Sequence, residues 1–301
     1  MKNLLFPNNI KKIRIDVGTG STAPNTALWL KNNNHTGILC FEADPRSYNI
    51  LTKGGYTNQY SNYLRFTKRK YLLLNKKIIK KINPNIVKIF NVAISNSKKK
   101  KVNFFLSDAK NFGTSSLYKP IVSRLKQKIK KKIKVVVFSL QYFLSKIDWE
   151  KFEYIEFLKI DTQGNDINVL RSSGEYLKKV LFVQAEYWAN QSYIGEKNRN
   201  ECLLLIREFM KKKGFELYYY TLVDAYFVNT NLKKKIFLEN VIDNTMDFEK
   251  GLYRKSFFFN LFPGKLIFYA NLIFFFRSFK IFNFLFYKLF KINFKKFIYK
   301  F

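Results

Sequence analysis

Hydrophobic positions near the start of the chain fall in two short segments, separated by a glycine turn and a longer mixed segment. Residues 13–17 alternate Ile and Val with two charged residues and precede Gly18 and Gly20, and residues 38–41 are wholly apolar and precede Glu42. Short apolar runs bounded by turn residues are typical of buried strands, and the segment between them has the length of a helix. Residues 13–45 therefore predict a strand, a glycine turn, a helix and a second strand that ends in a carboxylate.

The same alternation continues as far as residue 229. Apolar runs predict further strands at residues 86–95, 102–107, 155–160 and 180–188. Residues 135–144 predict a strand that leads into a helix, and residues 196–229 predict a helix followed by an antiparallel hairpin. Because strands alternate with helices, we expect an α/β fold with a doubly wound, mostly parallel sheet.

The glycine turn and the carboxylate form a candidate site for a cofactor that contains adenosine. Gly18 and Gly20 let the backbone approach a ligand, and Glu42 can accept hydrogen bonds from both hydroxyls of a ribose. Gly18, Gly20 and Ala23 also fit the fingerprint of nicotinamide dinucleotides. Asp16 would place a negative charge in the cleft, which repels a pyrophosphate but suits the ammonium and sulfonium of S-adenosylmethionine. The alternative, in which Asp16 caps the turn or pairs with a nearby lysine, would remove this discrimination.

Two further carboxylates come at the ends of apolar strands. Asp161 follows residues 155–160, and Glu186 ends the run that begins at residue 180. The carboxyl ends of parallel strands meet at one edge of a sheet, so both acids are expected at one crevice. The alternative for each is a helix cap or a turn former. The single histidine, His35, lies in a turn-rich link, so a histidine base is excluded.

Several polar residues near other predicted strand ends are candidates for binding. Asn91 and Ala93 fall near the end of the run at 86–95, where a doubly wound sheet places groups beside an adenine. Ser115 and Ser116 lie in a polar loop, where they either contact a substrate or form a turn. Residues 54–85 are a basic, tyrosine-rich insertion, which is either a lid or a surface excursion.

The composition is strongly basic. Lys and Arg number 55 against 21 Asp and Glu, which gives a formal net charge of +34. Such an excess favours contact with nucleic acid or an anionic membrane surface, but abundant Lys, Asn, Ile, Phe and Tyr are also what an AT-rich coding sequence gives.

Two cysteines in separate elements provide no disulfide framework, which favours a reducing interior. The first residues hold too short an apolar run for a signal peptide.

Residues 251–301 differ from the rest of the chain, because they hold ten Lys or Arg, no Asp or Glu and an excess of Phe. On a helical projection five of the basic side chains fall within an arc of roughly 80°, and Phe, Leu and Ile cover most of the remainder. This pattern predicts a helix that lies in a membrane interface. The uncharged run at 266–276 is too short for a spanning helix. The alternative is a tail that packs on the domain or mediates self-association.

Six motifs occur in the order found in the FkbM family of S-adenosylmethionine-dependent methyltransferases, and the chain resembles that family from residue 13 to residue 229. The motifs are DVGTGS, FEADP, NVAIS, GTSSL, LKIDTQGND with INVL, and FVQAE. The resemblance implies a Rossmann-like methyltransferase sheet of seven strands with an antiparallel last strand. It also implies methyl transfer to oxygen, often on a sugar or a glycosylated product.

The resemblance assigns roles to residues of this chain by position. The cofactor-binding residues would be Asp16, Gly18, Thr19, Gly20, Glu42, Asn91, Ala93 and Asp161. Asp161 would lie beside the transferred methyl group as the catalytic base, with Glu186 as the second candidate, and Ser115, Ser116 and Gln163 would bind the substrate. Many relatives read Asp-x-Glu-Gly where this chain has Gln163, which can orient a hydroxyl but cannot take its proton. That difference argues against a metal site.

The sequence is therefore interpreted as an S-adenosylmethionine-dependent O-methyltransferase that acts on a hydroxyl of a sugar in a glycan or glycolipid precursor. Residues 1–231 would form the catalytic domain, residues 232–250 a linker, and residues 251–301 a tail that binds an anionic membrane surface. The expected location is the cytoplasm, at the inner face of a membrane. The alternatives are a nucleic-acid methyltransferase and a non-catalytic membrane scaffold with a degenerate cofactor cleft, and a nicotinamide oxidoreductase ranks last.

Overall fold

The computed structural model describes eight stretches of the chain, which are residues 4–32, 35–53, 83–108, 112–121, 129–187, 192–195, 197–221 and 223–233. Most of the predicted insertion at 54–85, most of the linker and the whole tail at 251–301 lie outside the described residues. The described stretches all belong to one compact unit of the chain. Within them, no helix has both the length and the apolar character needed to cross a membrane.

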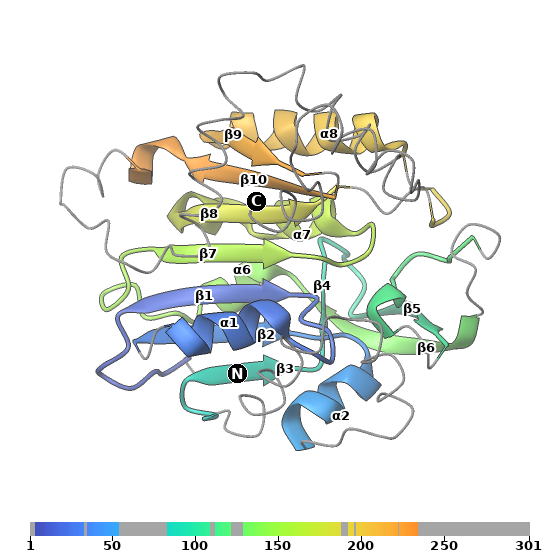
Figure 1. The fold of residues 1–301 in the computed structure, drawn as a ribbon, viewed down its shortest axis with the longest axis horizontal. Helices are drawn as coiled ribbons and strands as arrows, with labels where there is room; N and C mark the ends of the chain where they lie inside the picture. The colour runs from blue at the N-terminus through green and yellow to red at the C-terminus, as the bar shows by residue number, and fades with distance from the viewer. Residues whose placement is uncertain are drawn as a thin grey trace, which may run out of the picture. The chain divides into compact units, whose positions relative to one another are not determined.

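A seven-stranded sheet forms the centre of this unit (Figure 1). In spatial order its strands are β3 (Val87–Phe90), β2 (Thr36–Phe41), β1 (Lys12–Val17), β7 (Ile155–Ile160), β8 (Val180–Glu186), β10 (Asp224–Asn229) and β9 (Phe215–Tyr220). The strands from β3 to β8 run parallel, whereas β10 runs antiparallel to both of its neighbours. The mostly parallel sheet with an antiparallel last strand is confirmed.

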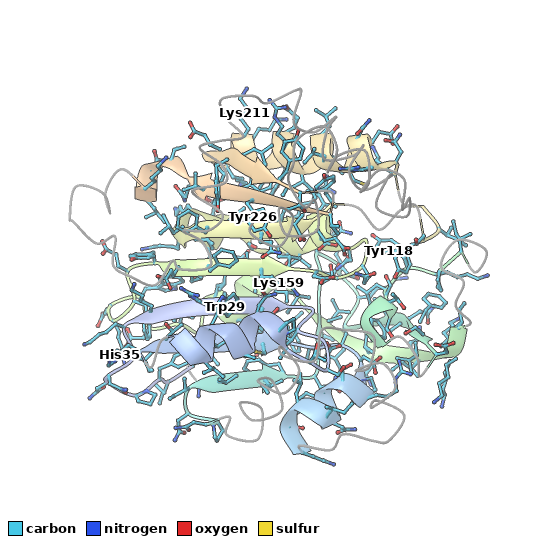
Figure 2. The ribbon with its side chains drawn as sticks, in the orientation of Figure 1. Trp29, His35, Tyr118, Lys159, Lys211 and Tyr226 are labelled. Atoms are coloured by element: carbon cyan, nitrogen blue, oxygen red, sulfur yellow. The ribbon has the colours of Figure 1, made fainter. Side chains whose placement is uncertain are left out.

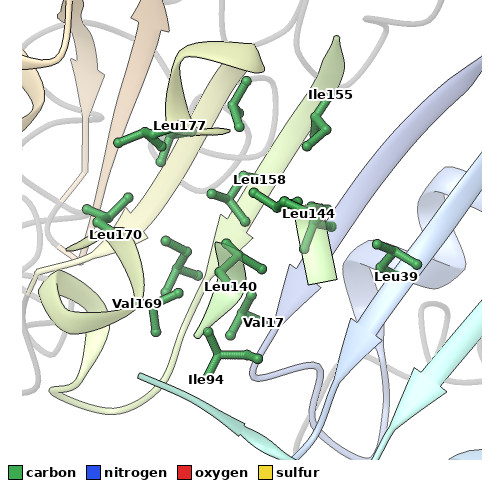
Figure 3. Close-up of a cluster of buried hydrophobic side chains, with 14 of the residues drawn as sticks. Val17, Leu39, Ile94, Leu140, Leu144, Ile155, Leu158, Val169, Leu170 and Leu177 are labelled. Atoms are coloured by element: carbon green, nitrogen blue, oxygen red, sulfur yellow. The ribbon is translucent and has the colours of Figure 1, made fainter. Parts of the chain in front are cut away.

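Buried side chains on the two faces of the central strands pack against different helices. Leu39 and Leu158 belong to the cluster that includes the helices α6 (Leu140–Leu144) and α7 (Asp166–Ser172) (Figure 3). Ile38 and Phe157 pack with Trp29 of α1 (Pro24–Asn32). A strand that is buried on both faces reads as a continuous apolar run, which is why these strands are visible in the sequence.

The remaining helices connect the strands. α2 (Pro45–Lys53) follows β2, and α8 (Arg199–Lys212) precedes the β9–β10 hairpin. The described residues also contain two short 3-10 helices, η1 (Phe112–Thr114) and η2 (Gly174–Lys179). The prediction of a helix before a terminal hairpin is confirmed.

The run at residues 86–95 was predicted as one strand, and this prediction is wrong. β3 ends at Phe90, and the next two paired residues belong to a second sheet of three strands, in the order β4 (Ala93–Ile94), β6 (Ile129–Phe138) and β5 (Lys101–Ser107). Where the chain leaves the first sheet, the Asn91 side-chain amide donates a hydrogen bond to the carbonyl oxygen of Glu42 at 2.8 Å. The second sheet lies beside the carboxyl ends of β1 and β2 (Figure 1).

β6 begins within a run of lysines, six residues before the strand that the apolar pattern predicted. Lys132 and Lys134 are exposed, whereas Val135 and Val137 are buried in a cluster with Phe104 of β5. Successive side chains of a strand point to opposite faces, so these two lysines and these two valines lie on opposite faces of β6.

Candidate functional site

The turn after β1 needs two glycines for different reasons. Gly18 has a φ of +74° and Gly20 a φ of +65°, which are left-handed values that favour glycine. A Cβ on Gly18 would overlap the carbonyl oxygen of Asp161, so no other residue fits there without moving the chain that follows β7. A Cβ on Gly20 would meet nothing within 4 Å. Gly18 therefore allows a close backbone approach, and Gly20 turns the backbone beside open space.

A cavity of about 200 Å³ lies at the carboxyl ends of β1, β2 and β7, with the second sheet as one wall. The predicted site residues that line it are Gly18, Thr19, Gly20, Glu42, Ala93, Ser115, Asp161 and Gln163. The predicted site residues outside the lining are Asp16, Asn91, Ser116 and Glu186. The strand ends thus bring together most of the residues that the sequence assigned to one site.

Glu42 is fixed between the glycine turn and the start of α2. Its Oε2 accepts a hydrogen bond from the backbone N–H of Gly20 at 2.6 Å, and its Oε1 accepts one from the N–H of Asp44 at 2.7 Å. Burial raises the pKa of Glu42 to about 7, although the two N–H donors and the charge of Lys159 oppose this shift. Each carboxylate oxygen has a second lone pair, so the pair of oxygens can still accept hydrogen bonds from two adjacent hydroxyls.

Asp16 does not point into the cavity, and the prediction that its charge selects the cofactor is corrected. The carboxylate is fully buried, accepts a hydrogen bond from Thr26 Oγ1 at 2.8 Å, and lies 3.3 Å from Lys159 Nζ. This is the alternative in which Asp16 pairs with a nearby lysine. Because Lys159 offsets its charge and its carboxylate lies outside the lining of the cavity, Asp16 is not placed to distinguish a sulfonium from a pyrophosphate.

Lys159 is the functional residue that the sequence reasoning missed. Its ammonium lies 3.3 Å from Asp16 Oδ1 and 3.5 Å from Asp161 Oδ2, and it donates a hydrogen bond to the carbonyl oxygen of Gly18 at 3.0 Å. Burial lowers the pKa of Lys159, but the charges of Asp16 and Asp161 outweigh burial and hold the pKa above its ordinary value. The available signal was a lysine near the end of the mostly apolar strand at 155–160.

Gln163 connects the two predicted catalytic acids. Its Nε2 lies 2.9 Å from Asp161 Oδ1 and 2.9 Å from Glu186 Oε2. Asp161 reaches the cavity with a side chain that is 41% exposed, whereas Glu186 lies behind it at the end of β8. The two acids therefore belong to one hydrogen-bonded group, as their positions at neighbouring strand ends predicted.

The acids around this group hold their protons more tightly than usual. The pKa of Glu186 is raised well above its ordinary value by burial and by the charge of Asp161. The same two causes raise the pKa of Asp166 to about 7 and raise the pKa of Asp224. A carboxyl group with a raised pKa can exchange a proton near neutral pH, which general acid–base catalysis requires.

The serines and Asn91 mainly support the walls of the cavity. Ser115 Oγ donates a hydrogen bond to Asp44 Oδ2 at 3.0 Å and lines the cavity. Ser116 Oγ donates to the carbonyl oxygen of Gln163 at 2.7 Å and is buried. Their contacts suit the turn-forming alternative, while Ser115 remains accessible from the cavity.

His35 directly precedes β2, so it lies at the opposite end of this strand from Glu42 (Figure 2). The described stretches contain no group of three His, Cys, Asp or Glu side chains arranged to hold a metal ion. The polar side chains that line the cavity include Glu42, Asp161, Gln163 and Lys159.

Comparison with known proteins gives one family. A family model described as "Methyltransferase FkbM domain" matches residues 16–217, which span the glycine turn, the cavity and the strand that ends in Glu186. No curated protein matches the chain.

Proposed function

The chain belongs to the FkbM family of methyltransferases, and from this premise we propose that it uses S-adenosylmethionine to methylate a hydroxyl of a sugar in a glycan or glycolipid precursor. Members of the family generally depend on S-adenosylmethionine. The observation that supports this cofactor is that the glycine turn, Glu42 and Asp161 all line one cavity. The proposed acceptor class follows from the resemblance of the six motifs.

The residues present suit the proposed cofactor. Glu42 would bind the ribose hydroxyls, because both of its oxygens are already oriented by backbone N–H groups. The open space beside Gly20 would admit the methionine part, and Ala93 would form part of the wall near the adenine. Lys159 would not bind the cofactor directly but would hold the turn through the Gly18 carbonyl oxygen.

Bound S-adenosylmethionine would supply an activated methyl group on a sulfonium. The protein would then place an acceptor oxygen in line with that methyl group, which accounts for much of the rate of such a reaction. Asp161 is the proposed base, because it lines the cavity and its Oδ2 lies 3.5 Å from Lys159 Nζ. A correctly placed base contributes roughly a hundredfold or more to the rate.

The first test is calorimetry of the full-length protein with S-adenosylmethionine, S-adenosylhomocysteine and NADH. Binding of the first two without the third is the expected result, and it justifies a screen of sugar and glycolipid acceptors with radiolabelled S-adenosylmethionine. Binding of NADH alone would contradict the proposal. Failure of all three to bind would favour the alternative of a non-catalytic scaffold.

A nucleic acid is the second candidate acceptor, because exposed lysines gather on and beside the β5–β6 hairpin. They are Lys98, Lys99, Lys100, Lys101, Lys130, Lys131, Lys132 and Lys134. Contacts to phosphates release counterions, so binding to a nucleic acid weakens steeply as salt rises. Methylation of RNA that declines steeply with salt would favour this candidate over a neutral sugar.

We also propose that residues 251–301 bind an anionic membrane surface, on the support of their basic and aromatic sequence pattern. The test is sedimentation of the full-length protein with vesicles of phosphatidylcholine, with and without phosphatidylserine. Binding that requires phosphatidylserine is expected, and equal recovery with both vesicles would contradict the electrostatic part of the proposal.

A further inference from the structure

Asp161 and Glu186 form a linked carboxyl pair. The Gln163 amide nitrogen lies 2.9 Å from an oxygen of each acid, and an amide has two N–H groups, so it can donate one to each. Both accepting oxygens contact the same nitrogen atom, so the two carboxyl groups are close neighbours. Two like charges at such a distance disfavour each other, and burial of Glu186 adds to this, so the pair is built to hold at least one proton.

Gln163 is held firmly in this position. Its backbone has a φ of +56°, its carbonyl oxygen accepts a hydrogen bond from Ser116, and its Oε1 lies 3.1 Å from the hydroxyl of Tyr193. Tyr193 is itself buried and donates to the carbonyl oxygen of Thr114 at 2.9 Å. A left-handed non-glycine residue that surrounding contacts hold in place is typical of a functional site.

The other charged groups around the pair come from four elements. Lys159 of β7 lies 3.5 Å from Asp161, and Asp16 of β1 shares that lysine. Asp166 of α7 and Asp224 of β10 interact electrostatically with Glu186 of β8. Apart from Lys159 these groups are all acids, so a positive charge in the cavity would favour loss of a proton from the pair.

We propose that Asp161 and Glu186, positioned by Gln163, act as one carboxyl pair that holds one proton before methyl transfer and two protons after it. This inference rests on the proposed function. Asp161 faces the cavity and receives the hydroxyl proton. Glu186 lies on the side of Asp161 away from the cavity and shares the proton. Gln163 is a positioning residue.

The proposed step balances in atoms and charge. The acceptor O–H bond breaks and an O–CH₃ bond forms, while the S–CH₃ bond breaks and leaves its electron pair on sulfur. The hydroxyl proton passes to the carboxyl pair. The pair loses its negative charge in the same step that turns the sulfonium into a neutral thioether, so the net charge of the cavity stays constant. A buried site gains from this because uncompensated charge is costly there.

The consequence can be measured without knowing the acceptor. Full-length protein is titrated with S-adenosylmethionine and with S-adenosylhomocysteine in two buffers of different ionisation enthalpy, across the neutral pH range. Binding of S-adenosylhomocysteine should take up more protons than binding of S-adenosylmethionine, by about one proton at most. The preference for S-adenosylmethionine should therefore increase as pH rises, by up to roughly tenfold for each pH unit.

Variants distinguish proton uptake by the carboxyl pair from proton uptake by the ligands themselves. The double variant Asp161→Asn/Glu186→Gln keeps the size of both side chains but removes the titrating carboxyls, so the extra uptake should disappear. Glu150→Gln is the matched control, because Glu150 is exposed and precedes β7 at the opposite edge of the sheet. The amino group of each ligand titrates alike in every protein, so the difference between variants reports the pair.

Each outcome has one meaning. Extra uptake in the wild type and the control but not in the double variant supports the inference. Equal uptake in all three proteins overturns the inference and leaves the proposed function standing, since both ligands still bind. Failure of the wild type to bind either ligand overturns the proposed function and the inference with it.

The role of Gln163 has its own test. Gln163→Met removes the N–H donors, which stabilise the ionised carboxylates, so the pH range of the extra proton uptake should move upward. A merely structural role would weaken both ligands equally and leave that pH range unchanged, which would overturn the positioning role.

Discussion

Lys159 and Asp16 form an ion pair across the two central strands β7 and β1, with Nζ 3.3 Å from Oδ1 and both side chains almost sealed from solvent. The same ammonium donates a hydrogen bond to the carbonyl oxygen of Gly18. Lys159, which lies far from the turn in the sequence, therefore fixes the position of Gly18, the first glycine of the proposed cofactor turn. This relationship makes the turn depend on the pairing of β1 with β7.

Replacing Lys159 should destabilise the fold. Lys159→Met would leave Asp16 buried without its cation, and breaking a buried pair in this way costs about 3–5 kcal/mol of unfolding free energy. Urea unfolding followed by circular dichroism measures the loss. The double variant Lys159→Met/Asp16→Asn should recover part of it, and Lys98→Met, at an exposed site, should stay near the wild type. A double variant no more stable than Lys159→Met would contradict the ion-pair explanation.

The two glycines of the turn should respond differently to alanine. Gly18→Ala would force the new Cβ against the Asp161 carbonyl oxygen, so a clear loss of thermal stability and of S-adenosylmethionine binding is expected. Gly20→Ala meets no protein atom within 4 Å, so it should cost only the strain of a left-handed backbone, about 1–2 kcal/mol. Scanning calorimetry and ligand titration distinguish the two, and equal melting temperatures for both variants would count against this geometry.

Glu42 should make stability depend on pH. Burial raises its pKa from 4.5 to about 7 in the folded protein, so the folded state holds a proton that the unfolded state releases between these values. The contribution of Glu42 to stability is therefore complete at low pH and falls as pH rises through this window, by about 3 kcal/mol. Glu42→Gln should lack this component in urea titrations at several pH values. A wild type and variant whose curves run parallel across the window would refute it, and Glu150→Gln should parallel the wild type.

Asp161→Asn should separate chemistry from binding. The amide keeps the shape of the side chain but cannot take a proton, so turnover should fall by about a hundredfold or more. Affinity for S-adenosylmethionine should change far less, because Glu42 and the glycine turn remain. Single-turnover methylation and calorimetry on the same preparation measure the two effects. Equal losses of rate and affinity would rule out the assignment of Asp161 as the base.

The sheet and its glycine turn could be predicted because their signals are local. Residues 13–17, 38–41 and 155–160 are buried on both faces, so apolar residues predominate in each, and Glu42 and Asp161 directly follow the second and third segments. The break between β3 and β4 was not visible, because residues 86–95 are apolar in both sheets. Only the second sheet, which pairs β4 with β6 far along the chain, divides the run.

The charge of Asp16 was misjudged for a similar reason. Its partner Lys159 lies in another strand, and register between β1 and β7 sets Asp16 directly beside it. A sequence shows that a lysine interrupts an apolar strand, but it does not show which acid that lysine meets. The Gln163 contacts with Asp161 and Glu186 likewise depend on the spacing between β7 and β8.

β6 contributes exposed positive charge on one face and packing behind the cavity wall on the other. Lys132 and Lys134 face away from the cluster in which Val135 and Val137 pack with Phe104, and Phe104 lines the cavity. Mutational pressure toward lysine codons can therefore act on one side of this strand without altering the wall behind it. A protein with these lysines exchanged for glutamine should keep its pocket, so surface charge and catalysis can be engineered independently.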